Sequence, residues 1–265
     1  MLDLSYKETW LHRTNPSFKF IVMIALFIYV LFIHNLNLMV NITILTLLLY
    51  LLFSGHSFKL LLLISIPLVL IFVSSATSMV FFGKGETTWF KWGLIHVTEE
   101  SFYRGIHIGL RALTYAGLGI AFSLTTRPVY LFYSLMQQLK LPPKYAYSFL
   151  AALRMLPIMV EEFQTIRYAL KVRGMRHKRG IKGIYGKLRS YAIPLLAQSI
   201  RRAHRVAVAM EAKRFSQVKN RTYYYKITFS RFDILFLLYF IVMLSAAYFL
   251  SEQLPYFPII DVRYE

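Results

Sequence analysis

The chain contains no cysteine, and only 16% of its 265 residues are charged. The absence of cysteine excludes a disulfide-stapled scaffold, a cysteine nucleophile, an iron–sulfur cluster and a cysteine zinc site. The low charge content argues against an ordinary soluble domain, in which about 25% of residues are charged. Acidic residues are the scarcer sign, with 12 against 31 lysines and arginines, for a formal net charge of +19.

Hydrophobic residues make up 57% of the chain and aromatic residues 17%, a composition that excludes disorder. Crossing a bilayer takes about 20 mostly apolar residues per helix. Five runs meet or approach that length: Phe18–Ile33, Leu36–Phe53, Leu60–Phe82, Gly105–Thr125 and Ile234–Leu250. We therefore expect an all-α, polytopic membrane protein with about five transmembrane helices.

Two features lie around the fourth run. Residues 83–103 before it mix glycines, both charge signs and tryptophans, and predict an interfacial loop or a short amphipathic helix, because tryptophan favours the headgroup zone. Small residues within the run are expected to let helices pack closely. They are Ala112, Ala116, Gly117, Gly119 and Ala121.

The positive charge is concentrated in one block. Residues 167–231 hold 18 lysines or arginines and a single acidic residue, Glu211. Lysine and arginine are enriched in cytoplasmic loops, so this block is expected to be cytoplasmic. Five alternating spans then place the N-terminus inside and the C-terminus outside.

The region between the fourth and fifth runs reads as about three amphipathic helices. Prolines and apolar periodicity predict them over Val129–Leu139, from Lys144 to about Val172, and from near Pro194, with a glycine-rich basic turn at 174–186 before the third. The expected organisation is residues 1–126 as the first four transmembrane helices, 127–231 as a cytoplasmic domain, and 232–265 as the last transmembrane helix and tail.

Nothing in the sequence assembles a catalytic site. The seven histidines are scattered without metal-binding spacing, and Gly180–Leu188 fails the phosphate-loop pattern at Ile181 and Leu188. We therefore expect no enzyme activity, no cofactor and no metal. Glu161 and Glu162 are expected to pair with neighbouring arginines rather than to relay protons.

Arg111 lies inside the fourth apolar run. An arginine there costs about 2.5–3.5 kcal/mol on insertion scales and usually faces a partner or a wet cavity. Two interpretations stay open: pairing within the helix bundle, or contact with another membrane subunit.

Two short segments resemble each other. Lys171–Gly174 ends the second helix of the basic region and Glu211–Phe215 ends the third, and each carries a basic side chain at a helix C-terminus. Cations favour that end of the helix dipole, and glycine suits the position after the last helical turn, so capping alone explains either one. Two such ends on paired helices suggest instead a plug that reaches two equivalent sockets.

Several motifs together resemble the transmembrane T-component of energy-coupling factor (ECF) vitamin transporters, over nearly the whole chain. Asn15–Lys19 is similar to the family's D-P-R-x-K segment, and Ala151–Pro157 to its A-L-R-F-x-P helix. Further similar segments are Thr125–Pro128, Ala209–Ala212 and Arg221–Tyr223.

The resemblance implies two cytoplasmic coupling helices ending in x-R-x motifs that dock on a pair of ABC ATPase subunits. The first motif maps to Val172, Arg173 and Gly174. The second maps to Ala212, Lys213 and Arg214, with lysine where arginine is usual and arginine where glycine is usual. Because arginine and lysine are not interchangeable at a bidentate site, either Lys213 docks more weakly or Arg214 makes the contact after a one-residue shift.

The function implied is a non-catalytic membrane subunit that links two cytosolic ATPases to a substrate-binding S-component for vitamin uptake, with the lipid bilayer as surroundings and no nucleic acid as partner. Two alternatives from other classes are a self-contained secondary transporter and a membrane-anchored nucleic-acid-binding protein. The first would need an inverted repeat, and the second would use the basic block with strongly salt-dependent binding.

Overall fold

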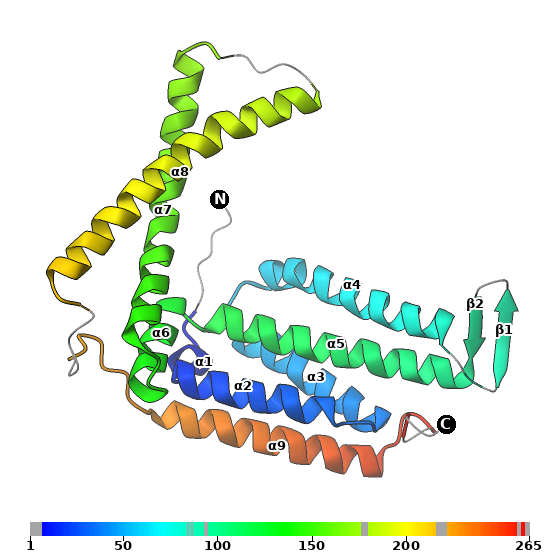
Figure 1. The fold of residues 1–265 in the computed structure, drawn as a ribbon. Helices are drawn as coiled ribbons and strands as arrows, with labels where there is room; N and C mark the ends of the chain where they lie inside the picture. The colour runs from blue at the N-terminus through cyan, green and yellow to red at the C-terminus, as the bar shows by residue number, and fades with distance from the viewer. Residues whose placement is uncertain are drawn as a thin grey trace. The chain divides into compact units, whose positions relative to one another are not determined.

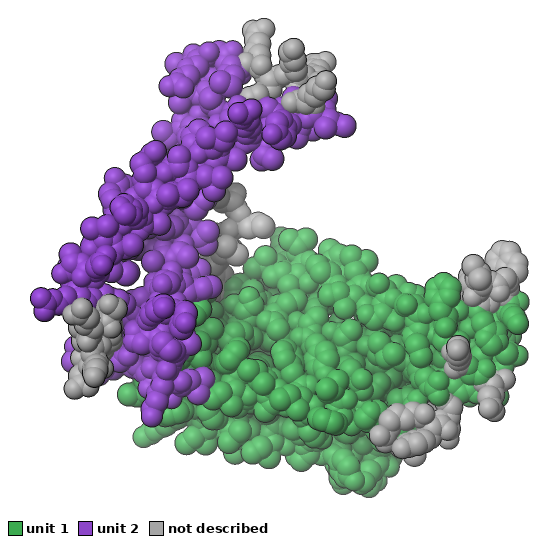
Figure 2. All heavy atoms as spheres, in the orientation of Figure 1, with its two compact units in different colours: residues 1–135, 227–265 green, residues 136–226 purple. Residues whose placement is uncertain are grey.

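The computed structural model describes residues 7–83, 85, 87–92, 95–175, 180–215, 222–258 and 261–262. The chain divides into two compact units, residues 1–135 with 227–265 and residues 136–226, shown in green and purple in Figure 2. The expected boundaries at residues 126/127 and 231/232 stay a prediction, since they concern the membrane and its cytoplasmic side.

Helices dominate the described residues, which confirms the all-α class. Four helices are long and apolar enough to cross a membrane: α3 (Leu36–Phe53), α4 (Phe58–Phe82), α5 (Glu99–Thr125) and α9 (Arg231–Gln253). The remaining predicted span forms α2 (Pro16–Leu31), a 16-residue apolar helix. A single turn, α1 (Trp10–Arg13), precedes it.

The first unit is a bundle in which α2, α3, α5 and α9 lie side by side (Figure 1). Its core is built from side chains of all four helices, among them Met23, Ile42, Leu118 and Phe240. A smaller cluster around Tyr50 joins α3, α4 and α5. The outer faces of α4 and α9 expose many large apolar side chains, as expected for helices surrounded by lipid.

The short amphipathic helix expected as one alternative for residues 83–103 is wrong, and the interfacial position of this segment stays a prediction. The described part of this segment forms a two-stranded antiparallel hairpin, β1 (Thr88–Trp92) and β2 (Ile95–Thr98), followed at once by α5. The aromatic residues Trp89, Phe90 and Trp92 in β1 favour a strand, and Thr98 ends β2 by capping α5, where its hydroxyl accepts from the Ser101 amide.

Two of the expected small residues, Ala116 and Ala121, pack in the cluster that α5 forms with α3 and α4, and Gly105, which was not among those expected, lies still closer to α4. A Cβ on Gly105 would lie 2.5 Å from Val80 Cγ2 and 2.9 Å from the Ala76 carbonyl oxygen, both on α4. A Cβ on Gly117 would make only ordinary contacts, and one on Gly119 would meet nothing within 4 Å. Gly105 therefore sets how closely the two helices approach.

Gly105→Ala is expected to destabilise the first unit by about 1–3 kcal/mol, because the added methyl group forces α4 away from α5. Gly119→Ala supplies the matched control, since alanine is a better helix former by roughly 0.5–1 kcal/mol and meets no neighbour there. Thermal melting of the two purified variants should move in opposite directions. Equal shifts would show that the α4–α5 approach is not tight.

The second unit contains the end of α6 (Pro128–Gln138) together with α7 (Pro143–Val172) and α8 (Ile181–Ala212). The three predicted helices exist, but the expected start of the third near Pro194 is wrong. The helix begins at Ile181, so Pro194 lies inside it, and the turn before it ends at Gly180. Proline removes one backbone donor and strains a helix without always ending it.

Candidate functional site

The C-terminal end of α7 closes with a Schellman motif. The Gly174 amide donates to the Lys171 carbonyl at 3.1 Å, and the Met175 amide donates to the Leu170 carbonyl at 3.2 Å. Gly174 has the left-handed φ of 66° that this motif requires after the last helical residues. Arg173 is the C-cap, and the side chains of Val172 and Arg173 are exposed.

The C-terminal end of α8 closes in the same way without glycine. The Arg214 amide donates to the Glu211 carbonyl at 2.8 Å, and the Phe215 amide donates to the Met210 carbonyl at 3.0 Å. Arg214 takes the left-handed conformation with φ 50°, and Lys213 is the C-cap. A side chain other than glycine in this conformation costs about 1 kcal/mol.

The two ends therefore correspond residue by residue. Lys213 stands where Arg173 stands, Arg214 stands where Gly174 stands, and Ala212, Lys213 and Arg214 are all exposed. The sequence departs from the glycine pattern at this position, yet the backbone turn is kept.

The helices α7 and α8 cross within the second unit, and Figure 1 shows their last turns leading away from the crossing. An ion pair between Glu162 and Arg202 and a ring contact of 5.1 Å between Phe163 and Tyr191 mark where they meet. Glu162 thus pairs with an arginine, as expected. The two contacts lie nine and ten residues before the end of α7 at Val172, but ten and twenty-one residues before the end of α8 at Ala212, so the end of α8 extends farther beyond the crossing.

A buried polar centre lies in the first unit, where α2 and α9 begin and α5 ends. Lys19 is 1% exposed, and its Nζ donates to the Leu11 carbonyl at 2.6 Å and to the Thr125 carbonyl at 3.2 Å. The Thr125 and Thr126 hydroxyls accept at 3.1 and 3.3 Å. Lys19 therefore ties α1 and the end of α5 to α2.

Asn15 and Asp233 complete this centre. The Asn15 side chain caps α2 by accepting from the Ser17 amide, and its backbone amide donates to Asp233 Oδ1 at 2.6 Å. The Ser134 hydroxyl on α6 donates to Asn15 Oδ1 at 2.8 Å. The segment that resembles D-P-R-x-K thus joins α2 to α6 and α9.

The part played by Asp233 was missed at the level of sequence. A signal was present, because Ser230 and Asp233 have the spacing of a capping box ahead of an apolar run. The structure has this box, with the Ser230 amide donating to Asp233 Oδ2 at 2.6 Å. Nothing in the sequence pointed to Ser134.

Arg111, on α5, caps the C-terminal end of α2. Its Nη2 donates to the Ile33 carbonyl at 2.7 Å, just past the end of α2, where helix carbonyls lack intrahelical partners. This contact is internal to the first unit. The expected contact of Arg111 with another membrane subunit stays a prediction.

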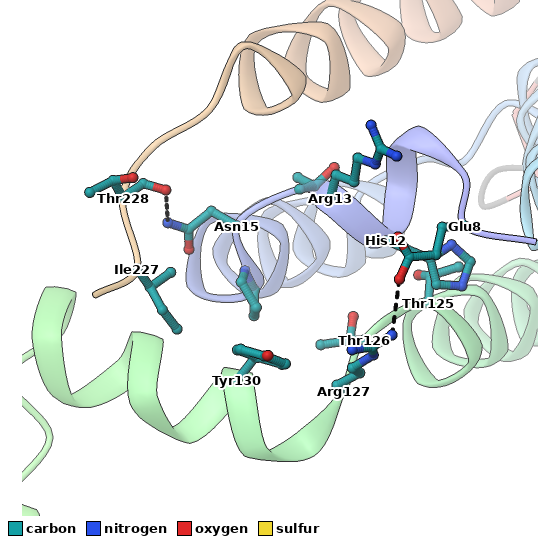
Figure 3. Close-up of a pocket in the computed structure, with 12 residues that line it drawn as sticks. Glu8, His12, Arg13, Asn15, Thr125, Thr126, Arg127, Tyr130, Ile227 and Thr228 are labelled. Carbon is teal, nitrogen blue, oxygen red and sulfur yellow. Dashed lines mark hydrogen bonds and ion pairs between the residues drawn. The ribbon is translucent and has the colours of Figure 1, made fainter. Parts of the chain in front are cut away.

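A pocket of about 250 Å³ opens beside the polar centre (Figure 3). Arg13, Arg127 and Tyr130 line it together with Glu8, which forms an ion pair of 3.0 Å with Arg127. The remaining lining residues are His12, Thr14, Asn15, Pro16, Thr125, Thr126, Ile227 and Thr228.

His12 makes the stability of the first unit depend on pH. Burial, followed by the positive charges of Lys19 and His56, lowers the pKa of His12 below its usual 6.5. Its Nδ1 accepts from the Thr9 amide at 3.2 Å, which requires an unprotonated nitrogen. The stability that unprotonated His12 contributes to the folded state is fully present above about pH 6.5. It is lost as the pH falls through the lowered pKa that His12 has in the folded state.

We therefore expect the melting temperature of the protein to fall between about pH 7.5 and pH 5 by more than that of His12→Gln, which retains an acceptor that does not titrate. Melting curves of both proteins across this pH range measure the difference. Parallel curves would show that the His12 site does not couple protonation to folding.

Comparison with known proteins supplies the family. The family model described as cobalt transport protein, CbiQ, matches residues 7–224. The energy-coupling factor transporter transmembrane protein EcfT of Brevibacillus brevis is 30% identical over 231 residues, 84% of this chain and 87% of that protein. The EcfT protein of Streptococcus thermophilus is 29% identical over 86% of this chain and 89% of that protein. The EcfT protein of Macrococcus caseolyticus is 26% identical over 87% of this chain and 90% of that protein. Together with the membrane-length helices, these matches show that the chain belongs to the CbiQ and EcfT family, the transmembrane components of energy-coupling factor transporters.

Proposed function

We propose that the chain is the coupling subunit of an ECF importer for vitamins. In this proposal it hydrolyses no ATP itself. It binds two cytosolic ABC ATPases through the ends of α7 and α8, and it holds a membrane S-component that carries the substrate. The basic region that includes α7 and α8 lies in the cytoplasm, as its excess of lysine and arginine suggests.

The observation that supports docking at two sockets is the equivalence of the two helix ends. Each end has an exposed basic C-cap residue and the same backbone turn. A pair of similar ATPase subunits offers two similar surfaces. Docking on two similar surfaces explains why both helix ends carry the same features, whereas helix capping would explain each end only separately.

Apolar faces on α7 and α8 support contact with a membrane partner. Leu156, Val160 and Ile200 are each more than half exposed, as are Tyr168 and Leu196. Movement of the ATPases at the helix ends would then tilt the crossed helices beneath whatever packs on these faces. This lever is the proposed route from ATP hydrolysis to the S-component.

The backbone correspondence favours Lys213 over Arg214 for the second docking contact. Lys213 occupies the C-cap position that Arg173 occupies, whereas Arg214 occupies the position of Gly174. A one-residue shift would instead require the left-handed residue to make the contact. Lys213 offers a point charge rather than a planar fork, so the second contact is the weaker of the two.

The proposal predicts opposite results for two neighbouring substitutions. Lys213→Ala should reduce the amount of ATPase that co-purifies about tenfold, because a charge-assisted hydrogen bond is lost. Arg214→Gly should retain association and relieve about 1 kcal/mol of left-handed strain. Quantified co-purification from membranes containing equal amounts of each variant measures both. Loss of association in Arg214→Gly alone would assign the contact to Arg214.

Purification of the tagged chain from its native membrane separates the function classes. Two ATPases and a small membrane protein should be recovered with it. Nucleic acid that is released by salt would favour the nucleic-acid-binding alternative. Recovery of the chain alone, with uptake intact in vesicles that contain no other subunit, would favour a self-contained transporter.

A further inference from the structure

The end of α8 lies well beyond the point where α7 and α8 meet. Figure 1 shows the two helices crossing, so that their ends lie apart, and the ion pair between Glu162 and Arg202 marks the crossing. From Arg202 the helix continues to Ala212, about 15 Å of helix length. A helix held at the crossing alone would leave its end free to swing, and Lys213 would then have no fixed position relative to α7.

A contact between two rings attaches the end of α8 to α7 a second time. Phe215, directly after the left-handed Arg214, has its ring centre 5.1 Å from that of Tyr147, with the ring planes at 88°. Aromatic pairs prefer this edge-to-face arrangement. Both rings are half-buried, and Tyr147 lies near the start of α7, well before Glu162. The contact therefore closes a triangle with the crossing, in which the ring pair is the strut.

The other docking turn has a corresponding contact. Met175 comes directly after the left-handed Gly174, the place that Phe215 has in the turn of α8. Its Sδ lies 3.8 Å from the hydroxyl oxygen of Ser190 on α8. This contact is the weaker of the two, since the Ser190 hydroxyl also lies 2.8 Å from the Gly186 carbonyl oxygen, a better acceptor. Each docking turn is thus followed by a residue that contacts the opposite helix.

Helix capping does not account for the ring contact. The Phe215 amide donates to the Met210 carbonyl, so the backbone alone closes the turn at the end of α8. The apolar contact that usually accompanies such a turn is made with the last turn of the same helix. Tyr147 belongs to the other helix, so its contact with Phe215 fixes the position of the turn rather than its conformation.

We propose that Tyr147 and Phe215 are positioning residues, which hold Lys213 at a set distance from Arg173 and so fix the separation of the two docking turns. The positioning role rests on the proposed docking of ATPases at both turns, whereas the strut exists without them. Only molecules whose turns have the right separation can bind both ATPase subunits at once. Loss of the strut lowers the fraction of such molecules, and the apparent affinity falls by the same factor.

The separation of the turns can be measured directly, because the chain contains no cysteine of its own. Ala169 and Ala209 are exposed, and their carbonyls accept from the C-cap amides of α7 and α8, so they occupy equivalent positions. Spin labels on cysteines placed at both positions give the distance distribution in detergent, without ATPase. We expect Phe215→Ala to broaden this distribution. Tyr185→Ala is the matched control, since it removes an exposed aromatic ring of α8 outside the strut, and it should leave the distribution unchanged.

Titration of the ATPase pair onto the full chain in nanodiscs tests the positioning role. Phe215→Ala and Tyr147→Ala should each weaken binding about fivefold, the value of one ring pair. The double variant should be no weaker than either single variant, because one contact can be lost only once. Tyr147→Phe retains the ring, and we expect it, like Tyr185→Ala, to bind within about twofold of the wild type.

The outcomes separate the strut from the docking function. Equal distance distributions for Phe215→Ala and Tyr185→Ala would overturn the strut. A broadened distribution with unchanged ATPase affinity, or additive losses in the double variant, would overturn the positioning role. A wild type that binds no ATPase would overturn the docking function and with it the positioning role, and the distance distributions would still show whether the strut exists.

Discussion

Arg173→Ala is expected to abolish uptake and to weaken ATPase association by about 30-fold or more. Truncating one partner of a buried, hydrogen-bonded charge pair costs about 2–5 kcal/mol, and each 1.4 kcal/mol is tenfold in affinity. Arg173 is an exposed C-cap residue whose backbone amide, not its side chain, closes α7. The substitution therefore removes the docking group without removing the helix end. Uptake and co-purified ATPase, at matched membrane levels, give the result.

Arg205→Ala is the matched control for this effect. Arg205 is exposed on α8, in the same basic unit, and is not at a helix end. We expect its replacement to change association by less than about twofold, the size typical of an exposed charge. If Arg205→Ala and Arg173→Ala reduce association equally, general positive charge rather than docking at the helix end holds the ATPases.

Lys19→Met should produce the largest loss of stability in the first unit, about 3 kcal/mol. Methionine fills similar volume, but it leaves the Leu11 and Thr125 carbonyls buried without their donor, and each unsatisfied group costs about 1–3 kcal/mol. The ends of α1 and α5 lose their tie to α2. Thermal melting in detergent and the yield of monodisperse protein measure the effect.

Lys59→Met provides the comparison for that loss. Lys59 is exposed, and the substitution also exchanges a lysine for a methionine at this end of the helices. It should change stability by less than about 0.5 kcal/mol. A melting temperature for Lys19→Met equal to that of Lys59→Met would show that the polar centre does not stabilise the bundle.

The sequence predicted the helices that have long apolar runs, because lipid requires length and apolarity and both are visible residue by residue. The helix over Leu36–Phe53 was located to the residue. The start of α8 was missed because Pro194 is usually a breaker, and here the helix continues on both sides of it. The hairpin was missed because aromatic residues in a short charged segment suit an interfacial helix as well as a strand.

Part of the candidate site was also predictable from the sequence. Basic residues at the two helix ends are visible in sequence, and the family resemblance assigned them a role. The left-handed conformation of Arg214 was not visible, because glycine is the usual signal for that turn. The contacts of Asn15 with Ser134 and Asp233 join residues more than a hundred positions apart, and no local pattern reports such distances.

The most direct test of the coupling proposal is titration of the ATPase pair onto the full chain in lipid nanodiscs. The wild type is compared with the triple variant Arg173→Ala, Lys213→Ala, Arg214→Ala. The proposal predicts saturable binding of two ATPase subunits to the wild type, and loss of that binding, together with uptake in cells, in a triple variant that still melts like the wild type. Normal ATPase binding and normal uptake by the triple variant would contradict it.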